Sequence, residues 1–370
     1  MRLFRPDPAV ASILLAIFAC VLSFAPAGAA EDQYLVADYT STLLSAFWNQ
    51  PVVMRAHIVL PDSYYKQPDR RYPTIYVVPA LDGTSDLGVP DELRWQKPMR
   101  ANGVEFIIVV LEPNFKNVHT LFADSANNGP WDSAVSQEFV PFIDSKLRTI
   151  PDPADRFLEG HSSGGWAALW LQITQPGVFG GVWSVSPDPV DFRDFTGADL
   201  LSPQANMFHD ATGKPYVMRG SGLYGGSMRD LLYRLPEQFR SDDAAYSPKG
   251  PDGKPETMFD WKTGAVDPAV IQYWEDHYDV ASLLAKQWPR LSNSLRGKIH
   301  IFVGDQDTFH LEGSVHLLDA VLQKLGAGAE IVYVPRADHW TVFDYNGDLF
   351  GYMIGEMKQA LPAGESSSGR

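Results

Sequence analysis

The chain has 370 residues, 45% of them hydrophobic, and a formal net charge of −15 at pH 7. This length and hydrophobic content allow one large domain or two ordinary ones, and they exclude a disordered protein. The single cysteine excludes a disulfide framework within the chain and a centre built from several thiolates. The acidic balance argues against nucleic-acid binding, which needs clustered basic charge.

Residues 1–30 have the three parts of a secretory signal peptide. Arg2 and Arg5 form the basic start, a short apolar run follows, and small residues at 25–30 provide a cleavage site. We therefore expect residues 1–30 to be removed and the mature protein to be secreted or periplasmic, with no membrane association after cleavage.

Two alternatives keep part of this segment in the mature protein. An uncleaved apolar run would be a membrane anchor, although it is too short to span a bilayer comfortably. Lipidation of Cys20 would tether the protein instead, but the bulky Phe18 and the apolar residues after Cys20 fit a lipidation signal poorly. With cleavage, the mature protein has no cysteine, which suits an oxidising compartment.

Short apolar runs alternate with amphipathic stretches along the rest of the chain. The nearly unbroken run of apolar and β-branched residues at 104–111 is typical of a strand buried on both faces of a parallel sheet. The predicted strands are, in chain order, 54–60, 74–78, 104–111, 156–159, 182–185, 299–303 and 330–334. Apolar residues at helical spacing predict helices over 135–147, 166–173, 315–325 and 350–361.

This alternation predicts an α/β fold with a parallel or mostly parallel central sheet flanked by helices. We expect residues 31–187 and 298–361 to form its core. The pattern breaks down over 188–297, which is rich in proline, glycine, aspartate and aromatic residues. We interpret this stretch as an insertion over the carboxyl edge of the sheet that shapes a pocket. The tail, 362–370, is small and polar and is expected to be disordered.

Gly160-His161-Ser162-Ser163-Gly164 follows a predicted strand and precedes a predicted helix. That is the context of a nucleophile elbow, in which a serine with strained dihedral angles stands above the sheet. Gly160 and Gly164 avoid the clashes that side chains would cause in so tight a turn. The sequence therefore predicts Ser162 as a nucleophile, whereas the alternative is an ordinary structural turn.

A serine nucleophile needs a base, and the base needs a carboxylate that orients it, in the chain order serine, acid, histidine. His339 follows the last predicted strand and is the expected general base. The acid should follow the strand at 299–303, where Asp305 and Asp307 are both candidates. We favour Asp307 because it lies farther past the strand end and can turn toward the histidine.

An oxyanion hole needs two preorganised backbone amides. One is expected from Ser163, directly after the nucleophile. The other should come from the loop after the strand at 74–78, where Gly83 permits close approach, and we favour the amide of Thr84. The alternative is that this loop is an ordinary Asp-Gly turn.

These residues resemble the putative-esterase family of α/β-hydrolases, which includes S-formylglutathione hydrolases, feruloyl esterases, enterochelin esterases and mycolyl transferases. The resemblance spans residues 54–360 and rests on the segments 76–83, 160–165 and 304–307 and on His339. It implies an α/β-hydrolase fold in which these positions supply oxyanion hole, nucleophile, acid and base. The segment 122–131 is similar to a loop near the active site of the enterochelin-esterase-like members. The expected substrate contacts are Asp82, Trp131, His161 and Trp340.

The sequence differs from the usual pattern of this family in two places. The usual His-Gly after the oxyanion strand is absent, and the insertion after Val185 is longer than usual. No metal or cofactor is expected, because the histidines lack the spacing of a zinc site and no phosphate-binding loop occurs.

The sequence thus predicts a secreted serine hydrolase that cleaves carboxylic esters of small molecules or glycans through a Ser-His-Asp triad and an acyl-enzyme. The alternatives are an acyltransferase of the mycolyl-transferase type and a non-catalytic binding protein on the same fold. Neither the individual ester nor the oligomeric state follows from the sequence.

Overall fold

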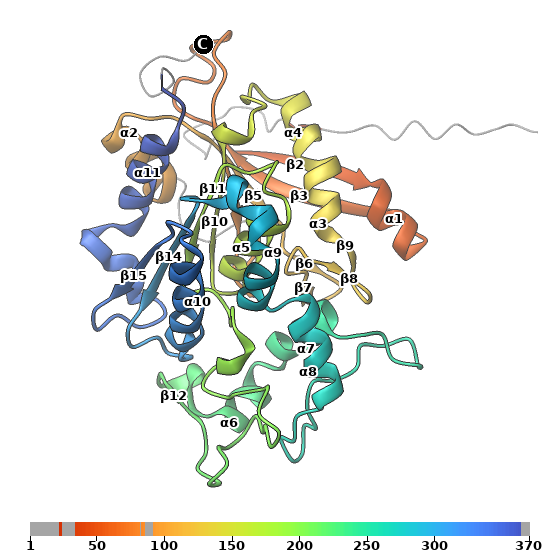
Figure 1. Ribbon diagram of the computed structural model, residues 1–370. Coiled ribbons are helices and arrows are strands. Elements are labelled where there is room, and N and C mark those ends of the chain that lie inside the picture. The colour runs from red at the N-terminus through yellow and green to blue at the C-terminus, as the bar shows by residue number, and fades with distance from the viewer. Residues whose placement is uncertain (1–21, 24–33, 82, 86–91, 364–370) are drawn as a thin grey trace, which may run out of the picture.

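The computed structural model describes residues 22–23, 34–81, 83–85 and 92–363. Within them, the main sheet has nine strands (Figure 1). Their spatial order is β1 (Leu22–Ser23), β2 (Tyr34–Ser41), β3 (Val52–Val59), β5 (Ile107–Leu111), β4 (Thr74–Val78), β10 (Arg156–His161), β11 (Gly181–Val185), β14 (Ile299–Gly304) and β15 (Glu330–Val334). Strands β5 to β15 pair in parallel, whereas β1, β2 and β3 pair antiparallel at one edge and β3 joins β5 antiparallel. The mostly parallel sheet that the sequence predicts is therefore confirmed.

Alternating apolar side chains of the parallel strands face two separate hydrophobic cores, because successive residues of a strand point to opposite faces. One core packs under α2 (Lys97–Asn102) and α11 (Leu349–Ala360). The other lies under helices on the opposite face. These are α1 (Thr42–Trp48), α3 (Trp131–Ala134), α4 (Val140–Lys146), α5 (Ser163–Thr174), α9 (Val280–Leu295) and α10 (Leu311–Leu325). The molecule is a three-layered sandwich with the sheet in the middle (Figure 1).

Short elements connect these layers. A π-helical turn, η1 (Glu92–Gln96), leads into α2, and a second, η2 (Val135–Phe139), joins α3 to α4. Two small hairpins follow β5 at the carboxyl edge of the sheet. They are formed by β6 (Asn114–Phe115) with β7 (Val118–His119), and by β8 (Asp124–Ser125) with β9 (Gly129–Pro130). The 3₁₀ turns η3 (Pro153–Asp155) and η6 (Thr341–Gly347) precede β10 and α11.

The stretch after β11 forms a layer below the carboxyl ends of the parallel strands (Figure 1). Its elements are η4 (Phe192–Asp194), β12 (Val217–Arg219), η5 (Gly222–Tyr224), β13 (Gly225–Ser227), α6 (Met228–Arg234), α7 (Pro236–Tyr246) and α8 (Pro268–His277). Helix α9 lies inside the predicted insertion but packs against α5 and α10, beside the sheet. The core was expected to resume at residue 298. Because α9 packs beside the sheet, the helical layer of the core resumes earlier, at Val280.

Several expectations fall on residues whose placement is not described. The predicted signal peptide, 1–30, lies outside the described residues except for Leu22 and Ser23, and so does Cys20. Asp82 and nearly all of the predicted disordered tail also lie outside them. Among the described helices, none combines the length and the apolar character needed to cross a bilayer.

Candidate active site

Ser162 occupies the turn between β10 and α5, with φ 58° and ψ −125°. A positive φ is unfavourable for a residue with a side chain, so the surrounding turn must hold it in place. A Cβ atom on Gly160 would lie 2.2 Å from the carbonyl oxygen of Gly164, and one on Gly164 would lie 2.0 Å from that of Val78. These glycines permit the close approach that the sequence analysis attributes to them, and the serine stands at the carboxyl end of the central strand.

Two loops at the same edge of the sheet bring His339 and Asp307 together. Nδ1 of His339 donates a hydrogen bond to Oδ2 of Asp307 at 2.8 Å, and both side chains are buried. Burial alone would raise the pKa of Asp307, but the neighbouring His339 and the hydrogen bonds from His339 and the Phe309 amide outweigh it and lower the pKa. The other candidate acid, Asp305, accepts a hydrogen bond from the Arg336 amide at 2.6 Å instead.

Ser162 and His339 line one cavity, yet no hydrogen bond joins them in the described part of the chain. The hydroxyl of Ser162 donates to Oδ1 of Asp188 at 3.3 Å. Catalytic hydrogen bonds are often long or misaligned before substrate binds, so this geometry is compatible with a serine–histidine pair.

His161, directly before the serine, supports the histidine loop. Its Nε2 donates a hydrogen bond to the backbone carbonyl of His339 at 3.0 Å, and the two rings lie 4.5 Å apart between centroids. Burial, with a smaller contribution from His339, lowers the pKa of His161 to about 3. The imidazole is therefore neutral at ordinary pH. His161 also lines the cavity, as expected for a substrate contact.

The cavity holds about 230 Å³ and lies between the sheet edge and the layer below it. Its walls are mainly apolar, and two of its polar side chains, His161 and Asp188, lie beside Ser162. The lining residues are Ala80, Leu81, His161, Ser162, Asp188, Pro189, Phe195, Thr196, Tyr224, Met228, Leu231, Leu235, Gln238, Phe239, Asp242, Phe309, Leu311, His339, Trp340 and Phe343. A concave apolar site with a few convergent polar groups is typical of a small-molecule site.

The two expected oxyanion donors differ in their placement. Ser163 is the first residue of α5, so its amide lies at a helix N-terminus beside Ser162. Thr84 is exposed and is not a lining residue of the cavity, whereas Leu81 of the same loop lines it. The structure therefore does not bring Thr84 to the cavity, and Leu81 becomes the better candidate for the second donor. His119 supports this loop, because its Nε2 donates to the Pro79 carbonyl at 2.9 Å.

The two tryptophans expected to contact substrate have different positions. Trp340 is 42% exposed and lines the mouth of the cavity, where its ring lies 4.7 Å from that of Tyr224. Trp131 is 2% exposed and packs in the hydrophobic core against Phe115 and Phe122. Its Nε1 donates to the carbonyl of Asn128. The structure gives Trp131 a core position, since a buried indole satisfied by its own loop has no surface left for substrate.

Sequence reasoning missed several polar residues of the cavity, among them Asp188, Gln238 and Asp242. Asp188 follows the parallel strand β11 closely, and polar residues at the carboxyl ends of parallel strands converge on one edge. That rule could have found Asp188. Gln238 and Asp242 come from α7, for which the sequence offered no placement.

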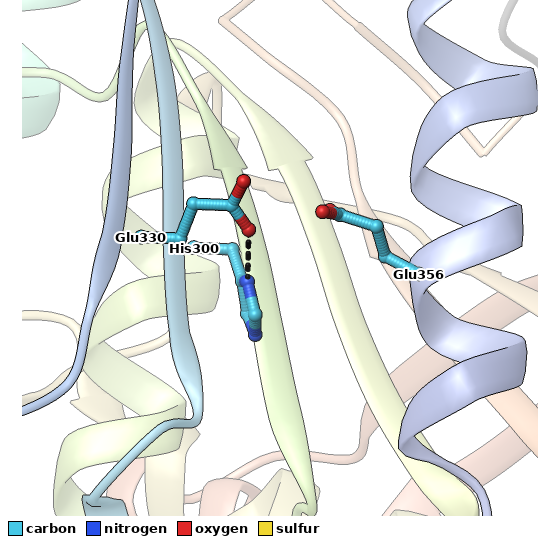
Figure 2. A group of neighbouring side chains, drawn as sticks. All are labelled: His300, Glu330 and Glu356. Carbon is cyan, nitrogen blue, oxygen red and sulfur yellow. Dashed lines mark hydrogen bonds and ion pairs between the residues drawn. The ribbon is translucent and has the colours of Figure 1, made fainter.

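A separate cluster lies at the opposite end of the sheet. Figure 2 shows His300 of β14 and Glu330 of β15 joined by a contact of 3.1 Å, with Glu356 of α11 facing them. Their ligand atoms lie within 4.8 Å of one another, a set that could hold a metal ion. The Trp183 indole already donates to Glu356 at 2.9 Å. The cluster lies at the amino ends of the strands, away from the cavity, and the expectation of no metal stays a prediction.

Comparisons with known proteins agree with this geometry. The profile of the family described as Putative esterase matches residues 51–315. No curated protein matches the sequence.

Solved structures share the fold at low identity. A ferulic acid esterase has a TM-score of 0.57 at 15% identity, covering 89% of this chain and 98% of its own. An S-formylglutathione hydrolase from Agrobacterium tumefaciens has a TM-score of 0.55 at 15% identity, covering 89% and 95%. A fluorophosphonate-binding serine hydrolase from Staphylococcus aureus has a TM-score of 0.51 at 14% identity, covering 88% and 97%. The fold is that of the α/β-hydrolases.

Proposed function

The chain belongs to the Putative esterase family, and on that premise we propose that it is a secreted serine hydrolase of carboxylic esters. Ser162 is the nucleophile, His339 the general base and Asp307 the residue that orients His339. One observation carries the proposal. A serine held at positive φ between β10 and α5 lines the same cavity as a histidine that is hydrogen-bonded to a buried carboxylate.

The reaction follows from this arrangement. Oγ of Ser162 attacks the ester carbonyl carbon while Nε2 of His339 takes the hydroxyl proton. The backbone amides of Ser163 and Leu81 stabilise the oxyanion, and Thr84 remains the alternative second donor. Collapse of the tetrahedral intermediate breaks the bond to the alcohol oxygen, which takes the proton from His339 and leaves an acyl-enzyme.

The second half regenerates the enzyme. Water attacks the acyl carbon while His339 accepts one of its protons, and collapse returns that proton to Oγ of Ser162 as the carboxylic acid leaves. Asp307 keeps Nδ1 of His339 protonated, so that Nε2 is free to accept a proton in both halves. Replacing water by another alcohol would give acyl transfer, and product analysis with added alcohols distinguishes the two.

Secretion rests on the predicted signal peptide, 1–30, and mass spectrometry of the mature N-terminus tests it. An N-terminus near residue 30 supports export with cleavage. An acylated Cys20 would contradict cleavage at that position.

The catalytic proposal is tested with Ser162→Ala. We expect hydrolysis of p-nitrophenyl acetate to fall by roughly a thousandfold or more, with an unchanged melting temperature. A fluorophosphonate probe should label the wild type and not the variant. Retained turnover in the variant would remove Ser162 from the mechanism, and absence of labelling in the wild type would favour a binding protein.

A further inference from the structure

A buried carboxylate lies directly beside the proposed nucleophile. Oδ1 of Asp188 accepts the hydrogen bond from Ser162 at 3.3 Å. Its Oδ2 accepts hydrogen bonds from the Ser163 hydroxyl at 2.7 Å and from Nε2 of Gln238 at 2.9 Å. The proposed triad gives this carboxylate no role, because Asp307 already orients the histidine.

A second carboxylate lines the same cavity. Asp242 is 3% exposed, and its Oδ1 accepts a hydrogen bond from Nε2 of Gln238 at 3.3 Å. Its Oδ2 receives no hydrogen bond from the described residues. Burial raises the pKa of both aspartates, and the nearby charge of Asp188 raises that of Asp242 further. No lysine or arginine is found among the described residues that line the cavity.

Asp188 already accepts hydrogen bonds from Ser162, Ser163 and Gln238, so the pair lacks positive charge rather than donors. Two neighbouring buried carboxylates repel each other unless one of them holds a proton or a ligand supplies a cation. A substrate with an ammonium group in this cavity would supply both the positive charge and further hydrogen-bond donors for the two carboxylates. A substrate with a carboxylate there would be repelled. The charge of the cavity therefore selects the chemistry of the acyl group, which must lie beside Ser162 when the acyl-enzyme forms.

The distance between Ser162 and Asp188 fixes where the ammonium group belongs. In an acyl-enzyme, an amino group on the α-carbon lies three bonds from Oγ of the serine, which places its nitrogen roughly 3 Å away. Oδ1 of Asp188 is 3.3 Å from the same Oγ. An α-ammonium group can therefore be within hydrogen-bond distance of this carboxylate while the carbonyl carbon is bonded to Ser162.

We propose that the cavity recognises esters of α-amino acids with a free ammonium group, and that Asp188 is the residue that binds it. This inference rests on the proposed serine-esterase function. The walls around the site come from Met228, Leu231, Leu235 and Phe239. Large apolar amino-acid side chains, such as those of leucine and phenylalanine, match these walls.

The test compares two esters that differ only in the amino group, L-phenylalanine methyl ester and methyl 3-phenylpropanoate. Rates are measured at pH 6, because the ester group lowers the pKa of the amino group below the value of about 7.7–8.0 that is usual for an α-amino group, and at pH 6 this group still carries its proton. Because an ammonium group makes its ester intrinsically more reactive, each kcat/KM is divided by the rate constant for hydroxide hydrolysis. We expect the corrected ratio to favour the amino ester about tenfold to a hundredfold, as for a hydrogen bond to a charged group.

Asp188→Asn removes the charge with little change in shape, and it should reduce the corrected ratio to near one. Asp210→Asn, a matched change on the surface outside the cavity, should leave the ratio unchanged. If Asp188→Asn does not fold, the wild type still decides. N-acetyl-L-phenylalanine methyl ester keeps the skeleton but loses the charge, and it should lose the preference.

Equal corrected rates on the two esters, or a preference that persists in Asp188→Asn, would overturn the ammonium site while Ser162 still reacts with a fluorophosphonate. Hydrolysis of neither ester despite labelling of Ser162 would also overturn it. No hydrolysis together with no labelling would reject the proposed function itself, so the two failures are distinguishable.

Discussion

The two aspartates after β14 offer a matched pair of substitutions that test the assignment of the acid. In Asp307→Asn, the Phe309 amide still donates to the Oδ1 position at 2.9 Å. That bond holds the carbamoyl oxygen in place and turns the new NH₂ group toward Nδ1 of His339. Two donors cannot face each other, so the imidazole must carry its proton on Nε2, where it can no longer accept one from Ser162.

The magnitude follows from this change of tautomer. A histidine in the wrong tautomer costs about 10⁴ in kcat in serine hydrolases of this kind, or about 5.5 kcal/mol at 1.36 kcal/mol per tenfold change. Asp305→Asn keeps an oxygen for the Arg336 amide and loses only a partly exposed charge. Such a change is worth roughly 0.5 kcal/mol, so activity should stay within about threefold.

The assay is kcat/KM for p-nitrophenyl acetate from pH 6 to pH 9, with a melting curve for each variant as the control for folding. A folded Asp307→Asn protein that keeps more than a tenth of the activity would refute the tautomer argument. A loss in Asp305→Asn as large as that in Asp307→Asn would refute the choice between the two acids.

Three further predictions concern residues around the site. Gly164→Ala puts a Cβ atom 2.0 Å from the Val78 carbonyl oxygen, so the elbow must move, and activity should fall by at least about 100-fold with a lower Tm. Trp131→Ala should lower the free energy of unfolding by about 3–5 kcal/mol and leave KM unchanged, whereas Trp340→Ala should raise KM about two- to tenfold and leave Tm unchanged. Burial raises the pKa of Asp132 from 3.8 to about 7, so its contribution to stability is present below pH 3.8 and is lost as pH rises through 7. Urea titrations at pH 4 and pH 8 give the free energy of unfolding at each pH. Asp132→Asn should reduce the difference between these two free energies by on the order of 4 kcal/mol for three pKa units. An unchanged difference would contradict a buried, protonated carboxyl group.

The sequence predicted the parallel part of the sheet closely because its inner strands are buried on both faces, and the partly buried edge strand β15 still carries a short β-branched and aromatic run. Thr74–Val78 and Glu330–Val334 were predicted with the observed bounds. Strand β2, Tyr34–Ser41, was not predicted, since it pairs near the sheet edge and mixes polar with apolar residues. The helix Val280–Leu295 was included in the insertion, because only its packing on α5 and α10 assigns it to the core.

The residues of the candidate site also fall into those that local sequence predicts and those that depend on how loops fold. The glycines around Ser162 and the strands that end before Asp307 and His339 are local sequence signals. The structure brings the side chains of Ser162, Asp307 and His339 to one edge of the sheet. The choice of Thr84 over Leu81 depended on the path of one loop, which no spacing determines. Trp131 was expected at the site from a loop resemblance, but its burial depends on how that loop folds back on the core.

The substrate preference could not be predicted from the sequence, for a physical reason. The apolar faces of α6 and α7 that line the cavity have the same pattern as faces that pack in a core, so the sequence cannot distinguish a wall from an interior. Asp188 and Asp242 are 54 positions apart, and only folding places both carboxylates around Gln238. The proposed reaction rests on short motifs at strand ends, whereas the charge proposed to select the substrate arises from contacts between distant segments. The acyl side of the cavity, rather than the triad, is therefore where measurements will distinguish this esterase from others with the same fold.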